Sequence, residues 1–526
     1  MFWLDRVFGE AEKALAAKIA AKETLIVRDE KTASGRVHVG SMRALALHAA
    51  ISERLAEAEI PHEFIYEIND FDPMDGLPVY LDQAEFGKYL GVPLCNIPSP
   101  DGKAANFAEY YAKEYEDAIH AAGFTPRFTR ASALYKEGKM NEIIREALEK
   151  VDTVKKIYKD LTGQDRPSDW YPINVICANC GKLSTTKVTE FDGNEVTYTC
   201  YPTAVDWTQG CGHVGTISPF DDNAKLLWKL DWAAKWKVYG VDIEGGGKDH
   251  YSKGGSRDYA RRISQEVFDY PEPFGVPNEF FLVGGKKMSS SKGAGYAAGD
   301  IVSLLPPHIF RLALYGKDIN QQINFDPEGD TIPVLFDTYD RIAEKVWAGE
   351  TDDDSRLFKY VNTEPWQGEQ RFLPRFSQVA FLVQMPHINM HVRVEEMKGS
   401  PLTELDKKEL KLRAEYASIW LERAADEEYK FVLQNDLPAG FAITDVQRKA
   451  LNGLMTYIDN KEHLDGQELH AVLHELRKQS GLEPKEFFGP IYLAFLGKDH
   501  GPKMGWFLSV LPRPFLDQKL FQALGL

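Results

Sequence analysis

The 526-residue sequence lacks any apolar run that approaches the roughly 20 residues needed to cross a bilayer. Its first residues, 1–8, are too short and too charged for a signal peptide. We therefore expect a cytoplasmic protein with no membrane partner. The sequence also lacks an internal repeat with a period of about 20–50 residues, which argues against solenoids and propellers.

An excess of positive charge is also missing, because 62 Lys and Arg stand against 79 Asp and Glu, for a net charge of -17. This balance argues against a nonspecific nucleic-acid coat. It still permits a local basic surface, since a ligand responds mainly to the charges near it. The hydrophobic content of 44% is ordinary for a globular chain, and the length suggests about two to four domains.

Cysteine is scarce, with five in the whole chain, which excludes a disulfide scaffold. Four of the five nevertheless cluster, as Cys177, Cys180, Cys200 and Cys211. A thiolate pair two residues apart, closed by a distant second pair, suits tetrahedral zinc in a reducing compartment. We predict a structural Zn²⁺ site in a ribbon of short hairpins at about 171–216, with His213 as an alternative to Cys211.

What the chain does contain begins with a turn at 32–41. It follows a strand-like run at 24–28 and precedes a helical pattern at 42–57. In this geometry backbone N–H groups and the helix dipole meet an anion. Gly35 and Gly40 let a nucleotide approach the backbone, and His38 is placed to donate to a phosphate.

A second strand at 63–68 makes a β-α-β unit, the start of a parallel sheet. It ends in an acidic turn at 69–76, and in open α/β sheets the carboxyl ends of the strands are the ligand side. We expect further strands at 236–244 and 279–283 and helices at 107–122, 139–161 and 256–268. Beyond residue 301 nearly every segment has helical periodicity, and the acidic run at 352–355 is predicted to be a surface loop.

The loop at 286–293, Lys-Lys-Met-Ser-Ser-Ser-Lys-Gly, is cationic and rich in hydroxyls, and it follows the last predicted strand. Lysines there could hold a triphosphate and neutralise the charge that develops on a leaving pyrophosphate. The loop therefore favours phosphoryl-transfer chemistry, together with the turn at 32–41.

The two loops carry a family resemblance. His38-Val39-Gly40-Ser41 resembles the HIGH motif of class I aminoacyl-tRNA synthetases, and the stretch from Lys287 to Ser291 resembles their KMSKS motif. The closest resemblance is to class I lysyl-tRNA synthetase and covers essentially the whole chain. It is supported by residues 32–35, 227–232, 247–250, 299–301, 306–311 and 488–492. The sequence departs from the family pattern at Ala33, Ser41 and Ser290.

The resemblance implies an α/β fold with a Rossmann-type doubly wound parallel sheet. An inserted connective region carries the zinc ribbon, and an all-α domain follows. The implied boundaries are 1–80 and 221–285 for the two halves of the sheet domain, 81–220 for the insertion, 286–340 for the KMSKS loop and stem-contact region, and 341–526 for a helical anticodon-binding domain.

The family makes lysyl-adenylate from lysine and ATP with Mg²⁺, then transfers lysine to the terminal 2′-hydroxyl of tRNA(Lys). We expect a monomer. The resemblance implies that His38, Lys287 and Lys292 are catalytic. The implied ATP contacts are Ser34, Gly35, His38, Gly40, Ser41, Lys287, Ser289 and Lys292.

A lysine ammonium requires carboxylates and aromatic faces. The candidates are Asp29, Glu30, Thr32, Trp228, Trp232, Asp242, Glu244 and His250. An i, i+4 tryptophan pair such as Trp228 and Trp232 also suits a core helix. The anticodon would be read by stacking and base-edge contacts, for which Phe372, Arg375, Phe376, Gln384, Trp420 and Phe431 are available.

Three alternatives remain. A glutamyl-tRNA synthetase would place arginines in the pocket, whereas the strand-end turns here are acidic. A HIGH-type nucleotidyltransferase acting on a small molecule would not need the long helical C-terminal part. A nonenzymatic RNA-binding module built on the zinc ribbon would leave both phosphate loops unexplained.

Overall fold

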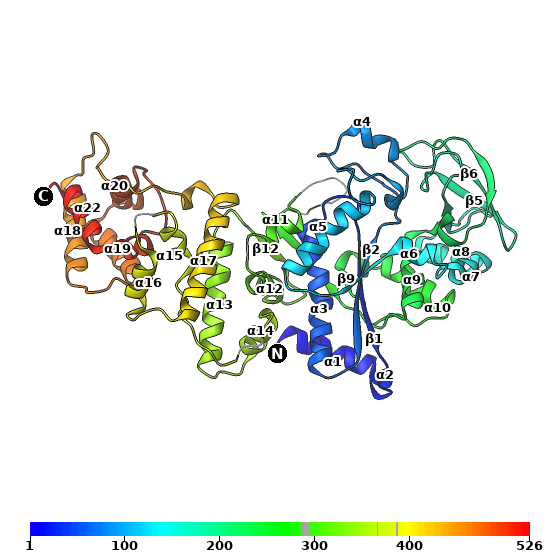
Figure 1. Cartoon of the computed structure of the whole chain (residues 1–526), viewed down its shortest axis with the longest axis horizontal. Coiled ribbons are helices and arrows are strands. Elements are labelled where there is room, and N and C mark those ends of the chain that lie inside the picture. Colours follow the sequence, from blue (N-terminus) through cyan, green and yellow to red (C-terminus); the bar gives the residue numbers. More distant parts are fainter. Residues whose placement is uncertain (287, 289–294, 365–366, 386–387) are drawn as a thin grey trace. The chain divides into compact units, whose positions relative to one another are not determined.

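A computed structural model describes residues 1–286, 288, 295–364, 367–385 and 388–526 (Figure 1). The chain forms two compact units. The first comprises Met1–Ser303, Phe310–Phe325 and Lys359–Glu364, and the second Leu304–Ile309, Asp326–Phe358 and Pro365–Leu526. No helix among the described residues combines the length and the apolar character needed to cross a membrane.

The first unit is built on a parallel sheet of β1 (Leu25–Thr32), β2 (His62–Asn69) and β3 (Arg127–Arg130), in which β2 lies in the middle. On the other side of β1, Val27 pairs in parallel with Ile243, and Ile243 pairs with Phe274. The chain therefore winds first to one side of β1 and then to the other. This is the doubly wound arrangement that the sequence predicts, with a topological switch point beside β1.

Alternation along β1 assigns its side chains to two faces. Asp29 points toward His48 of α3 (Met42–Glu57), and its β2 neighbour Tyr66 lies 3.2 Å from the hydroxyl of Tyr115 in α5 (Phe107–Ala121). Arg28 and Glu30 face the other way, toward α9 (Trp228–Tyr239). The sheet is thus covered by α3 and α5 on one face and by α9 on the other.

The predicted strand at 236–244 is wrong. Its first residues end helix α9, which stops at Gly240 in the left-handed conformation (φ 70°), and of the rest Ile243 pairs with β1. Residues 230–236 are all buried, so buried positions run right round the helix, and they include the charged residues Asp231 and Lys235. With charges among the buried residues the sequence shows no clear 3.6-residue apolar period, so its pattern cannot be distinguished from that of a buried strand.

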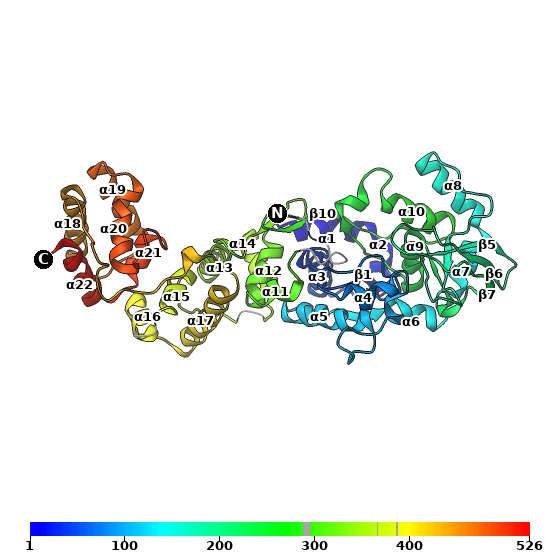
Figure 2. The ribbon, with the colours of Figure 1, turned by 90° about the horizontal axis from the view of Figure 1, so that it is seen from above.

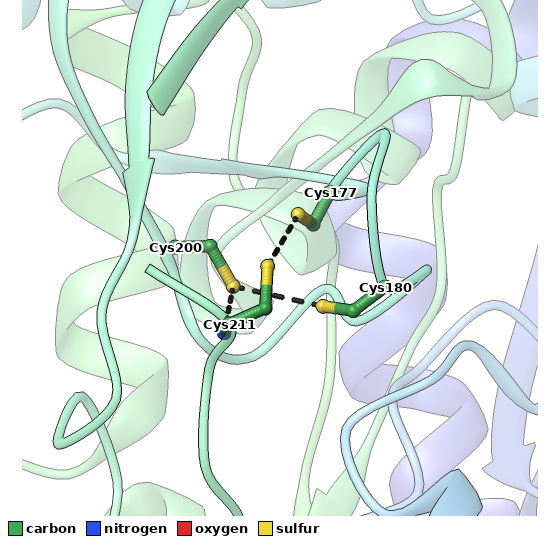
Figure 3. Close-up of side chains that lie close together, drawn as sticks. All are labelled: Cys177, Cys180, Cys200 and Cys211. Carbon is green, nitrogen blue, oxygen red and sulfur yellow. Dashed lines mark hydrogen bonds between the residues drawn. The ribbon is translucent and has the colours of Figure 1, made fainter. Parts of the chain in front are cut away.

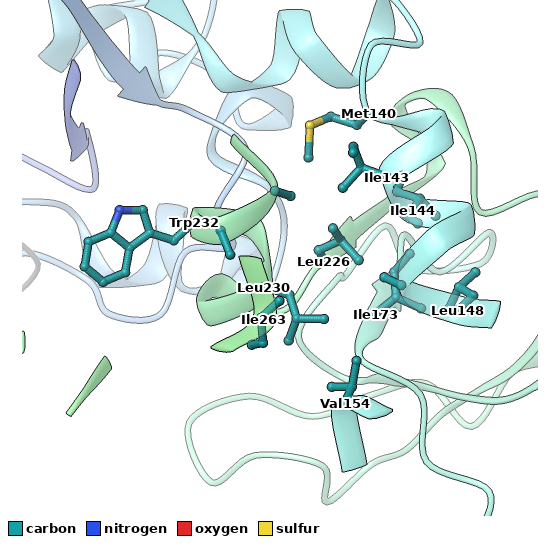
Figure 4. Close-up of a cluster of buried hydrophobic side chains, with 14 of the residues drawn as sticks. Met140, Ile143, Ile144, Leu148, Val154, Ile173, Leu226, Leu230, Trp232 and Ile263 are labelled. Atoms are coloured by element: carbon teal, nitrogen blue, oxygen red, sulfur yellow. The ribbon is translucent and has the colours of Figure 1, made fainter. Parts of the chain in front are cut away.

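The inserted region contains a ribbon of antiparallel strands, ordered β5-β6-β7, and a separate antiparallel pair of β4 and β8. A continuous apolar core joins this region to the sheet domain, and Ile144, Ile173, Leu226 and Ile263 are among its buried members (Figure 4). The predicted helix at 139–161 is two helices that meet at Lys150. The elements are α4 (Gln83–Phe86), α6 (Ala131–Lys136), α7 (Asn141–Glu149), α8 (Val151–Thr162), β4 (Ile173–Val175), β5 (Thr186–Phe191), β6 (Val196–Cys200), β7 (Val214–Ile217) and β8 (Ala224–Leu226).

The N-terminal residues form α1 and α2, and the predicted helix at 256–268 forms as α10. Of the predicted strand at 279–283, only the last three residues pair, as β11 with β12. The remaining elements up to residue 325 are α1 (Trp3–Ala14), α2 (Ala16–Ala20), β9 (Gly246–Gly247), α10 (Ser256–Glu266), β10 (Pro277–Asn278), β11 (Phe281–Val283), α11 (Ala298–Val302), α12 (Pro307–Tyr315) and β12 (Ile323–Phe325).

Described residues beyond 325 form helices, as their periodicity predicts, and α18 to α22 pack together in the second unit (Figure 2). Phe336 stacks on Phe376, and buried Trp420 donates to the carbonyl of Pro327 at 2.8 Å. The helices are α13 (Thr331–Trp347), α14 (Asp353–Val361), α15 (Phe376–Leu382), α16 (Met390–Lys398), α17 (Glu404–Arg423), α18 (Asp445–Asp459), α19 (Gly466–Ser480), α20 (Pro484–Leu496), α21 (Met504–Ser509) and α22 (Arg513–Leu524).

The acidic run at 352–355 is not the loop that the sequence predicts, because α14 begins within it. The carboxylate of Asp352 accepts the N–H of Ser355 at 3.1 Å, as an N-cap does. Carboxylates are favourable near the positive end of a helix, so the charge run marks a helix start.

Candidate active site

A cavity of about 340 Å³ opens at the carboxyl end of β1, at the switch point of the sheet. It brings together three segments that are far apart in the sequence: the end of β1 with the following turn, the start of α9, and the chain after Ile243. Its lining includes Asp29, Glu30, Lys31, His38, Gly40, Ser41, Arg43, Tyr66, Trp228, Trp232, Glu244, Gly245, Gly246, Gly247, Asp249, His250, Glu279, Phe281 and Met288.

The turn after β1 is held from outside the cavity. Arg36 binds Asp300 at 2.7 Å and Glu114 at 2.8 Å. The backbone N–H of Val39 donates to Tyr296, and that of Ala298 donates to Val37. The chain just beyond the lysine–serine loop is therefore fastened to the His38 turn, which leads through the short 3-10 helix Val39–Ser41 into α3.

Gly40 leaves no room for a side chain. A Cβ there would lie 2.9 Å from Nδ1 of His38 and 3.2 Å from Cε of Met288. Met288, inside the lysine–serine loop, thus lies against the turn and lines the same cavity. The predicted phosphate ligands of that loop, Lys287, Ser289 and Lys292, lie outside the described residues, and their roles stay predictions.

The predicted ATP residues divide into two groups. His38, Gly40 and Ser41 line the cavity, beside the N-terminus of α3. Ser34 and Gly35 are buried in the turn and are not among the lining residues. Because Ser34 and Gly35 are buried in the turn, they help to define its shape. Their direct contact with ATP stays a prediction.

The predicted lysine ligands divide in the same way. Asp29, Glu30, Trp228, Trp232, Glu244 and His250 line the cavity. Thr32 and Asp242 do not: the Thr32 hydroxyl donates to Asp72 at 2.8 Å, while Asp242 binds Lys18 at 2.6 Å and accepts the N–H of Ile26. Both side chains are committed elsewhere, so we do not include them in the proposed lysine pocket.

The two tryptophans form an aromatic wall. Their rings are stacked with centroids 6.3 Å apart, and the ring of His250 meets Trp232 edge-on at 5.5 Å. Trp228 is 50% exposed and Trp232 is 6% exposed. The pair therefore combines the two alternatives that the sequence left open, since one ring is part of the core and the other presents its surface to the cavity.

Beneath the cavity lies a network of buried charges that faces α9. Arg28 binds Glu244 at 2.9 Å, Glu67 at 3.2 Å and Glu30 at 2.6 Å. Lys235 binds Glu67 at 2.5 Å, Glu30 at 3.2 Å and Asp231 at 2.9 Å. Burial alone would raise the pKa of Glu30, but the two cations hold it well below its ordinary value. Glu30 and Glu244 are thus already neutralised by resident cations.

Asp29 differs from those two acids. Its Oδ1 accepts the N–H of Glu30, whereas its Oδ2 is buried and accepts no hydrogen bond from the described residues. The ring of His48 lies 3.5 Å away, but its Nδ1 also lies 2.8 Å from the carbonyl of Ala44 and its Nε2 accepts the N–H of Gly245. Asp29 is therefore the predicted acid with the greatest capacity for a cationic ligand.

The four clustered cysteines meet as predicted, with all sulfur atoms within 4.8 Å of one another (Figure 3). Sγ of Cys177 lies 3.6 Å from that of Cys211, and Sγ of Cys180 lies 3.7 Å from that of Cys200. Four thiolates in such a cluster suit tetrahedral zinc with no open position, which is a structural site. The fourth member of the cluster is Cys211, the favoured residue of the two that the sequence offered.

The second unit has its own hollow of about 1100 Å³. Trp506 lies in its lining, with the ring of His470 at 4.8 Å and the guanidinium of Arg375 at 4.6 Å. Of the predicted anticodon-reading residues, Phe372 and Arg375 line this hollow. Phe376, Trp420 and Phe431 are buried in the core, and Gln384 bonds to backbone groups of Ala380, Tyr429 and Phe431.

Sequence reasoning missed several lining residues. Tyr66 and Lys31 follow from strand alternation once Asp29 is taken as a pocket residue. Met288 lies inside a motif that was interpreted through its lysines and serines. Trp506 and His470 carry no local signal, because they lie 36 residues apart on different helices.

Comparison with known proteins identifies the family of this chain. The family model for class I tRNA synthetases (K) matches residues 1–364. The lysine–tRNA ligase of Methanosarcina barkeri is 31% identical over 513 residues, which cover 94% of this chain and 93% of that protein. The lysine–tRNA ligase of Methanocaldococcus jannaschii is 31% identical over 550 residues, 99% of each.

Among solved structures, a glutamate tRNA ligase from Elizabethkingia meningosepticum aligns over 96% of this chain and 99% of its own, with 12% identity and a TM-score of 0.36. That score is too low to bear on the function. The family model covers well over half of the sequence, and the chain belongs to the lysyl type of class I tRNA synthetases.

Proposed function

We propose that this protein is a lysine–tRNA ligase, which activates lysine with ATP and attaches it to tRNA(Lys). The observation that carries the proposal is the full-length similarity to proteins of that name. The cavity agrees with it, because an acid-lined, aromatic-walled pocket lies beside a glycine turn at a helix N-terminus.

ATP would bind at the turn, with its phosphates at the N-terminus of α3 and its adenosine over Gly40. His38, on the same turn, would donate to phosphate oxygens as charge develops on them. Lys287, Ser289 and Lys292 would hold the β- and γ-phosphates. Mg²⁺ would accompany ATP, because it binds phosphate oxygens with few protein ligands.

The first reaction needs no general base. A carboxylate is already ionised at neutral pH, so one of its oxygens attacks the α-phosphorus directly. The new bond joins the carboxylate to phosphorus, the bond from the α-phosphorus to the bridging oxygen breaks, and pyrophosphate leaves. In the second reaction the terminal 2′-hydroxyl of tRNA attacks the acyl carbon, the bond from that carbon to the phosphate oxygen breaks, and AMP leaves with the proton of the hydroxyl. The protein contributes positioning and charge stabilisation.

Lysine would lie across the mouth of the cavity, with its side-chain ammonium between Asp29 and the aromatic wall of Trp228 and His250. The free carboxylate oxygen of Asp29 would supply the charge, and a desolvated cation beside an aromatic face gains about 1–2 kcal/mol. Glu30 and Glu244 would act through the fixed network beneath. A glutamate side chain would meet carboxylates here and be repelled.

Two further parts complete the proposal. The cysteine cluster would hold one structural Zn²⁺, ligated by Cys177, Cys180, Cys200 and Cys211, that stabilises the ribbon. The anticodon would be read in the hollow of the second unit, where Trp506 and His470 offer faces for stacked bases.

The test is ATP–pyrophosphate exchange with each standard amino acid, with and without tRNA. We expect exchange that is driven by lysine and depends on added tRNA, because the family that this sequence resembles needs tRNA to activate lysine. Exchange driven by glutamate, or by no amino acid, would overturn the proposal.

A further inference from the structure

Lys31 occupies a position in the cavity that the proposed mechanism does not yet use. It lies on β1 two residues after Asp29, so strand alternation puts both side chains on the face covered by α3. Lys31 is the residue nearer to the carboxyl end, where the chain turns toward His38 and the N-terminus of α3. The side chain lines the cavity and therefore projects at the phosphate end of the pocket.

The other cations that the structure describes in, beneath and beside the cavity are already committed. Arg28 and Lys235 bind buried carboxylates, and Lys248 binds Glu279 at the rim. The Arg43 guanidinium donates to the carbonyls of Leu314 and Asp318. By contrast, within the part of the chain that the structure describes, the Lys31 ammonium forms no ion pair and no hydrogen bond with protein groups.

The surroundings of Lys31 include several acids that offset part of the cost of burying a cation. Burial is the larger effect and lowers the pKa of the Lys31 ammonium below its ordinary value, while Asp29, Glu30, Asp72 and Asp75 oppose that shift. Asp72 is itself bound by Lys225 at 3.1 Å and by the Thr32 hydroxyl. These acids help to keep Lys31 charged despite its burial but form no hydrogen bond with it, which leaves the ammonium available to a ligand.

We propose that the Lys31 ammonium is a catalytic group that binds the non-bridging oxygens of the α-phosphate as the lysine carboxylate attacks. This inference rests on the proposed function and adds a residue to it. During the attack two anions approach each other, and charge concentrates on the α-phosphoryl oxygens before pyrophosphate leaves. A cation that contacts those oxygens stabilises the transition state more strongly than it stabilises the bound substrates.

The position argues against a role in binding the substrate ammonium. Lys31 would repel that ammonium, which we place instead at the unbonded oxygen of Asp29, two residues earlier on the same face of β1. It also argues against a purely structural role, since the buried structural lysines of this chain, Lys235 on α9 and Lys225 on β8, form fixed ion pairs.

The test compares Lys31→Met and Lys31→Arg with the wild-type enzyme in lysine-dependent ATP–pyrophosphate exchange at saturating tRNA. We expect Lys31→Met to lower kcat roughly 100-fold, as loss of one transition-state donor does. The KM values for lysine and ATP should stay within about threefold, and Lys31→Arg should recover much of the rate. Lys18→Met, which removes the cation bound to Asp242 outside the cavity, is the matched control and should affect melting temperature more than kcat.

A kcat within about threefold of wild type for Lys31→Met would overturn the inference and leave the function standing. A loss confined to the KM for lysine would also overturn it, because Lys31 would then bind the ground-state carboxylate. A wild-type enzyme without lysine-dependent exchange would instead refute the proposed function itself.

Discussion

Replacement of Lys235 by Met tests whether the buried charge network holds the floor of the pocket. Lys235 is completely buried and lies within 3.2 Å of Glu67, Asp231 and Glu30. Methionine fills a similar volume but leaves these carboxylates with less compensation. Removing one partner of a buried ion pair costs about 3–5 kcal/mol, because the remaining charge is uncompensated. At about 2 °C per kcal/mol for a unit of this size, the melting temperature should fall by roughly 6–10 °C.

The same variant should show a distinctive pH dependence. Burial raises the pKa of Glu67, while Lys235 and Arg28 lower it. Without Lys235 the folded-state pKa rises further above the unfolded value. A carboxyl with a raised folded-state pKa stabilises the fold at low pH, and this contribution is lost as the pH rises through that pKa. The stability deficit of Lys235→Met should therefore be smaller at pH 5 than at pH 8.

The measurement is thermal unfolding of wild type, Lys235→Met and Lys113→Met across that pH range. Lys113 pairs with Asp117 on the surface of α5, where loss of the ion pair should cost less than about 1 kcal/mol at every pH. If Lys235→Met melts within about 2 °C of wild type, or if its deficit grows toward acid pH, the argument about this network is wrong.

Three further variants test other parts of the site. His38→Ala should lower the exchange turnover about 100- to 1000-fold with little change in lysine binding, as expected for a donor acting in the transition state. The turnover of His62→Ala, a change outside the cavity, should stay within roughly twofold of wild type. Similar turnovers for the two variants would refute the proposed role of His38. Metal analysis should find one zinc ion in the wild-type protein and none in Cys200→Ser. Cys95→Ser, a change outside the cluster, should keep the zinc ion. Equal zinc contents in the two variants would refute the assignment. Trp506→Ala should raise the KM for tRNA roughly tenfold with lysine activation unchanged at saturating tRNA, and an unchanged KM would place anticodon recognition elsewhere.

The helical elements were the most predictable part of this chain. The start of α19 is signalled by Asp465, whose carboxylate caps the helix, and that of α20 by Pro484 in its first turn. Cysteine spacing was equally informative, because few arrangements other than a metal site bring two such pairs together. The last turn of α9 was mistaken for the start of a strand, because buried residues surround the helix and include charged ones, which removes its 3.6-residue apolar period.

The chemistry of the pocket was only partly predictable. The motifs identified His38 and Gly40, and acid content identified Asp29 and Glu244. Sequence alone could not separate the acids neutralised by Arg28 from the one with a free oxygen, since the partners of Arg28 and Lys235 lie as far as 216 residues away. Strand alternation from Asp29 could have placed Lys31 in the pocket, but only the three-dimensional structure shows that its ammonium has no ion-pair partner among the described residues.

The central claim is that this protein joins lysine to tRNA. The most direct measurement is to incubate it with ATP, Mg²⁺, tRNA(Lys) and either lysine or glutamate, then weigh the 3′-terminal nucleotide of the tRNA by mass spectrometry. We predict a lysyl ester on the terminal adenosine in the lysine reaction and unmodified tRNA in the glutamate reaction. A glutamyl ester, or unmodified tRNA with lysine while free lysyl-adenylate accumulates, would contradict the account.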